Sequence, residues 1–257
     1  MQNKSHLKVS IITVVYNGVK YLEETMKNIH KQRYKNIEHI VIDGGSMDGT
    51  IDIIKKYEKN IAYWVSEPDD GQTDALIKGF DKCTGDILYW LNYDDLLYDE
   101  NTISDVVKVF ENNENIELVY GDDLLVDKDL NTIKLRDFSF HTFGKLLYYK
   151  SISQPSSFFT RKVYKEFGLN RELLCSMDLD LWLNIFSKYK TKYMNKILSK
   201  NRIHDERKMI AFEKEARVEA KELRYSHGAN KTFFNLFKYL YRTLDIKNYI
   251  VSKFYRV

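Results

Sequence analysis

The chain has 257 residues, 44% of them hydrophobic, which is enough apolar material for one sizeable core. Its 40 basic and 37 acidic residues give a formal net charge of +3, and this near balance argues against a dedicated nucleic-acid-binding protein. Two cysteines without zinc-ligand spacing, Cys83 and Cys175, and the lack of a recognisable signal peptide or membrane-spanning run favour a cytoplasmic protein without disulfides.

In the first half of the chain, short apolar runs alternate with segments of helical periodicity. The apolar runs predict β-strands at residues 8–17, 37–46, 61–67 and 86–92. Each is followed by a predicted helix, and these helices lie at residues 19–31, 50–59, 71–83 and 102–113. This order is typical of βαβ units and predicts an α/β fold with a mostly parallel sheet flanked by helices.

The pattern is looser after residue 115, and no internal repeat or low-complexity segment is found. Two further strands are predicted, at residues 116–127 and 132–140. Helices are predicted at residues 177–189, 205–227 and 231–257.

Polar side chains follow each of the first four predicted strands. They are Tyr16, Asn17, Asp43, Glu67, Asp69, Asp70, Asp94 and Asp95. One such residue is most often a helix cap, but four strands in succession predict a binding site, because ligands of open parallel sheets bind at the carboxyl ends of the strands.

The segment IDGGSMDGT, residues 42–50, follows the second strand. Asp43 is expected to accept a hydrogen bond from a nucleobase or a ribose hydroxyl, whereas Ser46 and Asp48 fit a glycine turn with a helix cap equally well. The first strand is followed by YNGVKYL, without the G-x-G-x-x-G of dinucleotide-binding proteins, which disfavours an NAD site.

Asp94 and Asp95 are adjacent carboxylates at the end of the apolar fourth strand. Such a pair repels itself unless a positive charge lies close by, and a cation shared with phosphate oxygens would supply that charge. The pair therefore predicts a site for Mg²⁺ or Mn²⁺. A turn capped at Asp99 or Thr102 accounts for the later residues but not for the pair.

Five segments in order, VSIITVVYNG, IVIDGGSMDGT, SEPDDGQTDALIKGF, GDILYWLNYDD and MDLDLWL, resemble the family 2 glycosyltransferases of GT-A fold. The resemblance runs from about Lys8 to about His204. It implies a Rossmann-like catalytic domain at 1–204, with a nucleotide-binding half at about 1–100 and an acceptor half at about 101–204. Residues 205–257 would then form a helical, basic C-terminal extension.

The resemblance also implies roles for single residues. Asn92 stands where the family usually has the first aspartate of its DxD motif, and Asp94, Asp95 and His204 are the expected metal ligands. The expected donor-binding residues are Thr13, Val15, Tyr16, Asn17, Asp43, Gly44, Ser46, Asp74, Lys78, Asn92, Tyr93 and Arg202.

Asp178 matches the catalytic base of the family, although Met177 stands where a glutamate is usual. The base would take the proton of an acceptor hydroxyl, and a single displacement would invert the anomeric centre. An aspartate at a helix start is also a frequent N-cap, a role open to Asp180 as well. Gln154 and Ser156 are expected to bind the acceptor, but a proline turn explains their segment equally well.

The tail from residue 231 to 257 has six basic residues against one acidic residue, with aromatic residues between them. A basic amphipathic helix of this kind is typical of binding to a membrane surface, whereas packing on the catalytic domain or on a second copy is the alternative. Nucleic acid is not an expected partner.

Together these features predict an inverting, metal-dependent transfer of a sugar from a nucleotide-sugar, with UDP favoured, to a glycan or lipid-linked acceptor in surface polysaccharide synthesis. The alternatives are a non-catalytic nucleotide-sugar-binding scaffold, motivated by Asn92 and Met177, and a sugar nucleotidyltransferase. The latter class usually has a glycine-rich, basic loop after the first strand, which this chain lacks.

Overall fold

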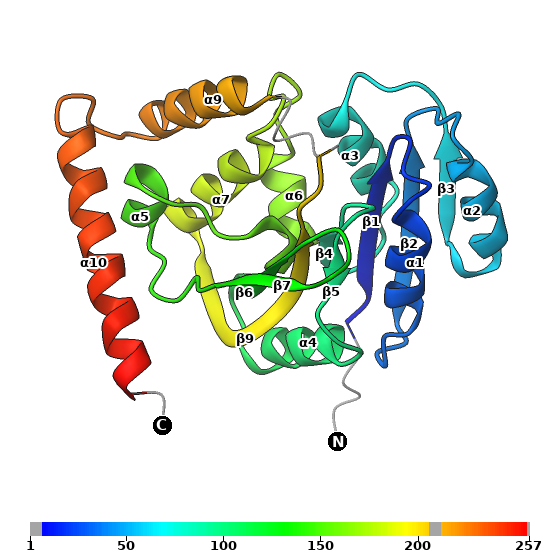
Figure 1. Ribbon diagram of the computed structural model, residues 1–257, viewed down its shortest axis with the longest axis horizontal. Helices are drawn as coiled ribbons and strands as arrows, with labels where there is room; N and C mark the ends of the chain where they lie inside the picture. Colours follow the sequence, from blue (N-terminus) through cyan, green and yellow to red (C-terminus); the bar gives the residue numbers. More distant parts are fainter. Residues whose placement is uncertain (1–6, 206–211, 256–257) are drawn as a thin grey trace.

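The computed structural model describes residues 7–205 and 212–255 (Figure 1). A central mixed sheet has helices on both faces, and its strands run in the order β3-β2-β1-β4-β8-β6-β9-β5, with β7 paired to β6. This arrangement confirms the predicted α/β fold with a mostly parallel sheet.

The first four strands are β1 (Val9–Val15), β2 (Ile37–Asp43), β3 (Tyr63–Ser66) and β4 (Ile87–Trp90), and they are all parallel. Their register places the last residues of three strands in one row, because Val15 pairs with Asp43 and Asp43 pairs with Ser66. The loops after these strands therefore start from one common edge, at the top of the sheet in Figure 1.

The helices after these strands lie close to their predicted positions. They are α1 (Leu22–His30), α2 (Thr50–Tyr57), α3 (Gln72–Asp81) and α4 (Thr102–Asn112). Apolar residues of α3 pack on one face of the sheet in a core shared with the later helices, and α1, α2 and α4 pack on the other face. Both faces of the parallel strands are thus covered, as their continuous apolar runs require.

The second half of the sheet is antiparallel in part. Its strands are β5 (Leu96–Leu97), β6 (Ile116–Val126), β7 (Thr132–Arg136), β8 (Ser157–Thr160) and β9 (Lys190–Arg202). β8 runs antiparallel to both β4 and β6, so it links the two halves of the sheet. β7 ends earlier than predicted, because the chain turns after Arg136 and the Phe138 N–H donates to Asp122.

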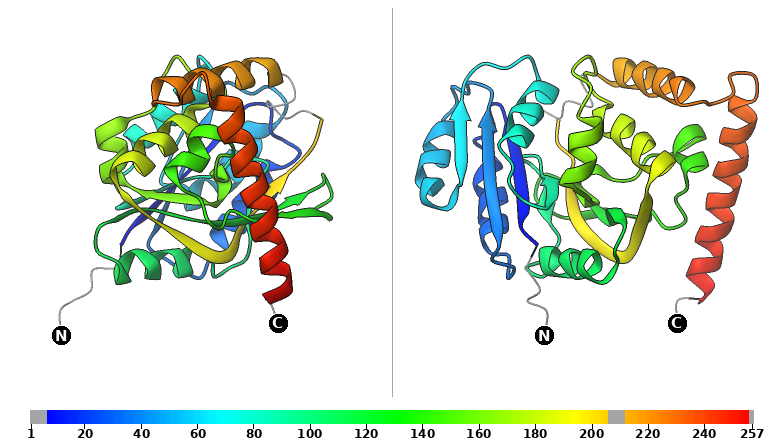
Figure 2. Two further views of the ribbon diagram at one scale, coloured as in Figure 1. Left: turned by 90° about the vertical axis from the view of Figure 1, so that its left-hand side faces the viewer. Right: turned by 180° about the vertical axis from the view of Figure 1, so that it is seen from behind.

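Strand β9 was not predicted, because lysine is depleted in strands. Lys190 and Lys192 are exposed, whereas Met194 and Leu198 are buried in the core with α4. β9 runs alongside β6 over its whole length and ends beside β5, which carries it from the far side of the molecule to the edge where β1–β4 end (Figures 1 and 2).

The remaining helices are α5 (Phe143–Tyr148), α6 (Arg161–Phe167), α7 (Met177–Lys188), α9 (Glu213–Ser226) and α10 (Phe234–Tyr255), with short 3-10 turns at Glu58–Asn60 (η1) and Gln154–Ser156 (η2). α9 lies across the top of α7 and contributes Leu223 to the core that also contains α3 and α7. The helix predicted at 205–227 thus begins at Glu213, and residues 206–211 lie outside the described part.

Helix α10 stands at the side of the molecule and packs on α5 (Figure 2). The contact is aromatic, since Tyr148 lies against the rings of Phe234, Phe237 and Tyr241. A second stripe at helical spacing is exposed and consists of Phe233, Leu236, Leu240 and Leu244. One face of α10 thus packs on α5. The exposed stripe of apolar residues is the surface that a membrane or a second copy of the chain would cover. None of the described helices combines the length and hydrophobicity that crossing a bilayer requires.

A buried chain of polar groups joins β1, β2 and α1 below the edge. The Thr13 hydroxyl lies 3.0 Å from His39 Nε2, and His39 Nδ1 lies 3.3 Å from His30 Nε2. Desolvation, and to a lesser degree the charge of His30, lowers the pKa of His39 from 6.5 to about 3. His39 is therefore neutral in the folded protein at pH 7.

This burial predicts a loss of stability in mild acid. In the unfolded chain His39 binds a proton near pH 6.5, whereas in the folded protein it binds one only near pH 3. Protonation therefore favours the unfolded chain. The contribution of neutral His39 to the free energy of unfolding is fully present above pH 6.5 and decreases as the pH is lowered below that value. Between pH 7.5 and 5 the His39 contribution is about 2 kcal/mol. Urea unfolding of wild type and His39→Gln at both pH values measures it; an equal pH dependence in the two proteins would contradict the assignment.

Candidate active site at the carboxyl edge of the sheet

The loop after β2 is organised by Asp43. Its carboxylate, completely buried, accepts hydrogen bonds from the backbone N–H groups of Gly45 (3.2 Å) and Ser46 (2.9 Å). The hydroxyls of Ser46 and Ser66 also donate to it. Four protein donors thus occupy this carboxylate, which holds the loop between β2 and α2 in place and leaves it no exposed oxygen for a nucleobase.

Tyr16 and Asp69 are the accessible groups beside this loop. The Tyr16 side chain is 60% exposed. A Cβ at Gly44 would lie 2.7 Å from Asp69 Oδ2 and 3.4 Å from the Tyr16 ring, so only glycine allows both side chains to approach the backbone here. Burial raises the pKa of Asp69, and its Oδ1 accepts a hydrogen bond from the Gly71 N–H. In the sequence, Asp69 is one of the polar residues that follow the predicted strands, but it is not among the expected donor-binding residues.

Three other residues expected near the nucleotide lie on β1 or directly after it: Thr13, Val15 and Asn17. Thr13 and Val15 are buried in β1, and the Val15 carbonyl accepts the Gly44 N–H, so neither side chain reaches the edge. Asn17, at φ 50°, accepts the Met47 N–H, and its own N–H donates to Ser46. The Thr13 and Val15 side chains are thus buried, and the expected part of this strand in donor binding stays a prediction.

Asp94 and His204 form a pair at the end of β4. Their side chains are almost buried, and His204 Nε2 lies 2.8 Å from Asp94 Oδ2. The His204 ring packs against Tyr21, and its Nδ1 has no hydrogen-bond partner among the described residues. The end of β9 therefore delivers a histidine directly to the first carboxylate of the expected metal site.

Asp95 is directed elsewhere. Its carboxylate accepts the backbone N–H of Arg202 at 3.0 Å and a longer bond, 3.4 Å, from the Asn92 amide. Asn92 in turn accepts from Gln72 (3.0 Å) and donates to Gln154 (3.3 Å). The structure thus brings Asp94 and His204 together, whereas Asp95 fastens β9 to the loop; the expected role of Asp95 as a metal ligand stays a prediction.

The residues present fit a divalent cation held in part by substrate. Adjacent ligands of an octahedral ion at 2.0–2.1 Å lie about 3 Å apart, close to the 2.8 Å between Asp94 Oδ2 and His204 Nε2. Among the described residues no group of three candidate ligands lies together. A cation here would take these two side chains and complete its shell with water and phosphate oxygens, as Mg²⁺ and Mn²⁺ commonly do.

Arg202 lies beside this pair and is 2% exposed. Its guanidinium packs on the Tyr21 ring, pairs with the half-exposed Glu24, and leaves Nε without a hydrogen-bond partner among the residues described. A buried arginine with an unsatisfied donor next to a candidate cation site suits a phosphate group. The role of Glu24 had no signal in the sequence, since its spacing is that of any exposed helix residue.

Asp74 and Lys78 belong to a chain of ion pairs on α3. Asp74 pairs with Lys78 (3.2 Å) and with Arg171 (2.7 Å), and Lys78 also pairs with Glu67 (2.9 Å). Partner charges lower the pKa of Asp74 and raise that of Lys78. These contacts connect α3 to the loop before α7, and a ligand of Lys78 would have to replace Glu67.

Tyr93, Gln154 and Ser156 differ in accessibility. Tyr93 is half-buried, and its ring covers Gly18. Gln154 donates to the Trp90 carbonyl at 2.6 Å as well as contacting Asn92, which places it at the site. Ser156 is completely buried and bonded to Ser199 and to the Asp122 carbonyl, so the expectation that its side chain binds an acceptor is wrong on burial.

Asp178 is the second residue of α7. The Leu179 N–H donates to it at 2.7 Å. Burial raises the pKa of Asp178 from 3.8 to about 6, against the lowering effects of the backbone N–H groups and the Arg224 charge. The preceding loop is tied to α3, because the Thr73 hydroxyl donates to the Leu173 carbonyl. A carboxylate of this basicity suits a general base.

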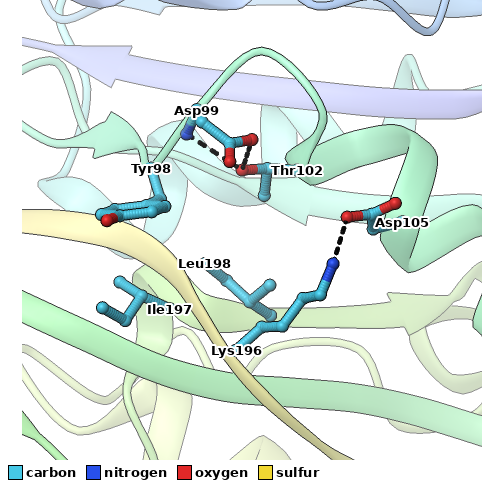
Figure 3. Close-up of a pocket in the computed structure, with 7 residues that line it drawn as sticks. All are labelled: Tyr98, Asp99, Thr102, Asp105, Lys196, Ile197 and Leu198. Carbon is cyan, nitrogen blue, oxygen red and sulfur yellow. Dashed lines mark hydrogen bonds and ion pairs between the residues drawn. The ribbon is translucent and has the colours of Figure 1, made fainter.

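Two surface cavities lie away from this edge. One, of about 230 Å³, lies between α4 and β9, where Lys196 pairs with Asp105 (Figure 3). The other, of about 580 Å³, lies at the start of α6 beside Lys162 and Glu117. Neither contains any of the residues expected at the site.

Comparisons with known proteins show the family and the fold. Residues 10–167 match the model of glycosyl transferase family 2. An uncharacterized glycosyltransferase of Rickettsia conorii is 33% identical over 215 residues, 79% of this chain and 35% of that protein. One of Mycobacterium tuberculosis is 36% identical over 114 residues, 44% of each protein. The matched part of the chain thus spans less than half the length of each of these relatives.

Solved structures show the same fold. Staphylococcus aureus TarS 1-349 in complex with UDP-GlcNAc has a TM-score of 0.71 at 15% identity, covering 90% of this chain and 70% of that one. The mannosyltransferase PcManGT from Pyrobaculum calidifontis, in complex with GDP-Man and Mn2+, has a TM-score of 0.68 at 18% identity, covering 91% and 69%. The fold is therefore GT-A-like, and with the match over more than half of its length the chain belongs to glycosyl transferase family 2.

Proposed function

We propose that the protein transfers a sugar from a nucleoside diphosphate sugar to a hydroxyl of a glycan or lipid-linked acceptor, with inversion at the anomeric carbon and with the help of Mn²⁺ or Mg²⁺. The observation that supports this best is the group formed by Asp94, His204 and Arg202 at the carboxyl edge of the sheet. It combines two cation ligands with a buried arginine, which is the chemistry that a diphosphate requires.

Different residues would bind the base, the diphosphate and the cation of the donor. Tyr16 and Asp69 flank the space where a base would lie, and Arg202 would bind the diphosphate. Asp94 and His204 would hold the cation, which supplies Lewis-acid stabilisation of the charge on the leaving diphosphate. Gln154, next to Asn92, would bind the acceptor.

Asp178 would act on the acceptor. It accepts the proton of the acceptor hydroxyl while that oxygen bonds to the anomeric carbon, and the bond from this carbon to the diphosphate oxygen breaks. One displacement with one base inverts the configuration, so an α-linked donor gives a β-linked product.

The donor is tested by thermal unfolding with UDP, dTDP and GDP, each with and without Mn²⁺. UDP is expected from the sequence resemblance, and GDP is included because a structural neighbour binds GDP-Man. A ligand at about 100 times its dissociation constant adds roughly 2.7 kcal/mol, or on the order of 5–10 °C for a chain of this size. A metal-dependent shift with one nucleotide supports the proposal; no shift with any of them would contradict it.

A donor that binds without being consumed would instead favour the scaffold alternative. Met177 is buried in the core beside Asp178 and offers no second carboxylate, so catalysis would depend on Asp178 alone. Release of the nucleoside diphosphate from the donor found in the thermal test, by wild type and by Asp178→Asn, separates an enzyme from a binding protein.

A further inference from the structure

Helix α9 holds the loop before α7 mainly through the side chain of Glu219. Glu219 is a half-buried residue in the middle of α9. Its carboxylate accepts three consecutive backbone N–H groups, those of Leu174 (2.6 Å), Cys175 (2.9 Å) and Ser176 (3.0 Å). Successive N–H groups that converge in this way form an anion-binding concavity, and here a carboxylate of the protein fills it.

The loop is held from both sides. Toward the sheet, its Arg171 and Leu173 are bonded to Asp74 and Thr73 of α3. Toward α9, the Ser176 hydroxyl donates to the Ala216 carbonyl in addition to the three bonds to Glu219. Ser176 directly precedes α7, so these contacts fix the first turn of the helix on which Asp178 lies.

Among the described residues, the groups that stabilise the charged Asp178 carboxylate are the backbone N–H groups of Leu179 and of Asp178 itself and the positive charge of Arg224. Arg224 lies on α9, five residues after Glu219. The Arg224 guanidinium is fixed by the Leu146 carbonyl (2.9 Å) and the Ala220 carbonyl (3.2 Å). The position of the Asp178 carboxylate therefore depends on the backbone that Glu219 holds and on a charge that the same helix supplies.

We propose that Glu219 is a positioning residue for the transfer reaction, which fixes residues 174–176 and thereby directs Asp178 at the acceptor hydroxyl. This inference rests on the proposed function of Asp178. It makes α9 part of the active site, although α9 and α7 both lie beyond residue 167, where the match to the family model ends.

The test compares Glu219→Ala and Glu219→Gln with Glu222→Gln, a change at an exposed glutamate of the same helix. Because a displacement of about 1 Å can cost 100-fold in rate, Glu219→Ala is expected to lower kcat for donor hydrolysis 10- to 100-fold. The donor KM and the Mn²⁺-dependent thermal shift should stay unchanged, since the donor side of the site is not touched. Glu219→Gln should fall between, because its amide accepts some of the three N–H groups but presents its own donors to the rest.

Two further readouts separate positioning from a general loss of structure. Formate added to Glu219→Ala should bind the three N–H groups that Glu219 leaves free and restore part of the activity. Formate should not raise the activity of wild type, Glu222→Gln or Asp178→Asn. The acid limb of the pH–rate profile should move to lower pH in Glu219→Ala, because a displaced Asp178 becomes more solvated.

The possible failures are distinguishable. If Asp178→Asn is as active as wild type, the base assignment and the proposed function fail together. If Asp178→Asn is inactive but Glu219→Ala keeps the wild-type kcat, or loses activity that formate does not restore, the positioning role alone is wrong. If Glu219→Ala does not fold, the acid limb of the pH–rate profile is measured in Glu219→Gln instead. A limb at the wild-type pH would contradict the positioning role.

Discussion

Replacing Asp178 with Asn is expected to lower turnover by about two to four orders of magnitude, the usual contribution of a general base. The amide is nearly isosteric and leaves the packing of α7 intact, but it cannot accept the acceptor proton. Donor binding should survive, because Asp178 lies on α7 and the donor groups lie on the loops after β1–β4 and on β9. Turnover and the nucleotide-dependent thermal shift, measured on the same preparation, test both statements.

The raised pKa of Asp178 adds a pH dependence to this result. Burial raises its pKa from 3.8 to about 6, and only the deprotonated carboxylate accepts a proton. The rate should therefore be low below pH 6, rise through that value and level off above it. Asp180→Asn is the matched control, since Asp180 lies two residues on and faces His227 at 3.7 Å. An equal loss in that control, or a flat profile in wild type, would contradict the assignment of Asp178.

Replacing Asp94 with Asn is expected to abolish the metal-dependent part of donor binding. Asp94 Oδ2 and His204 Nε2 are the two side-chain atoms that fit a cation, and an amide is a much weaker ligand than a carboxylate. The Mn²⁺-dependent rise in unfolding temperature with the correct nucleotide, on the order of 5–10 °C in wild type, should fall to near zero. Turnover should fall with it.

The design of this experiment separates metal binding from loop structure. His204→Ala should give the same loss, since it removes the second ligand. Asp99→Asn is the control, because Asp99 follows the short strand β5 and its side chain caps the turn at Asn101 and Thr102. A full metal-dependent shift in Asp94→Asn would mean that the cation, if bound, uses other ligands.

Much of the fold follows from the sequence, because its signals are local. The apolar runs of β1, β2 and β4 and the amphipathic segments of α1 to α4 specify strands and helices by their own periodicity. Strand β9 does not, since its lysines alternate with residues that become apolar core only when paired with β6. Likewise β8 is a four-residue strand whose position depends on β4 and β6.

At the edge of the sheet, the sequence predicts the position of some site residues but not whether a polar side chain is available to a ligand. Asp94, His204 and Arg202 lie together as expected, because the strand ends meet at one edge. Asp43 and Ser156 look like ligands by residue type, yet they are buried and saturated by hydrogen bonds from the protein. A sequence lists polar groups but does not say which of them already have partners. For Ser156 these partners are 34 and 43 positions away, and for Asp43 one of them, Ser66, is 23 positions away.

The sequence by itself therefore determined the family resemblance, the parallel half of the sheet and the edge on which the candidate site lies, because each is encoded in local patterns and strand order. Only the tertiary structure decided that Asp95 fastens β9 while Asp94 meets His204, and that Glu219 holds the loop before Asp178. These contacts join residues 43 to 110 positions apart, and their geometry is fixed by packing rather than by any local sequence signal.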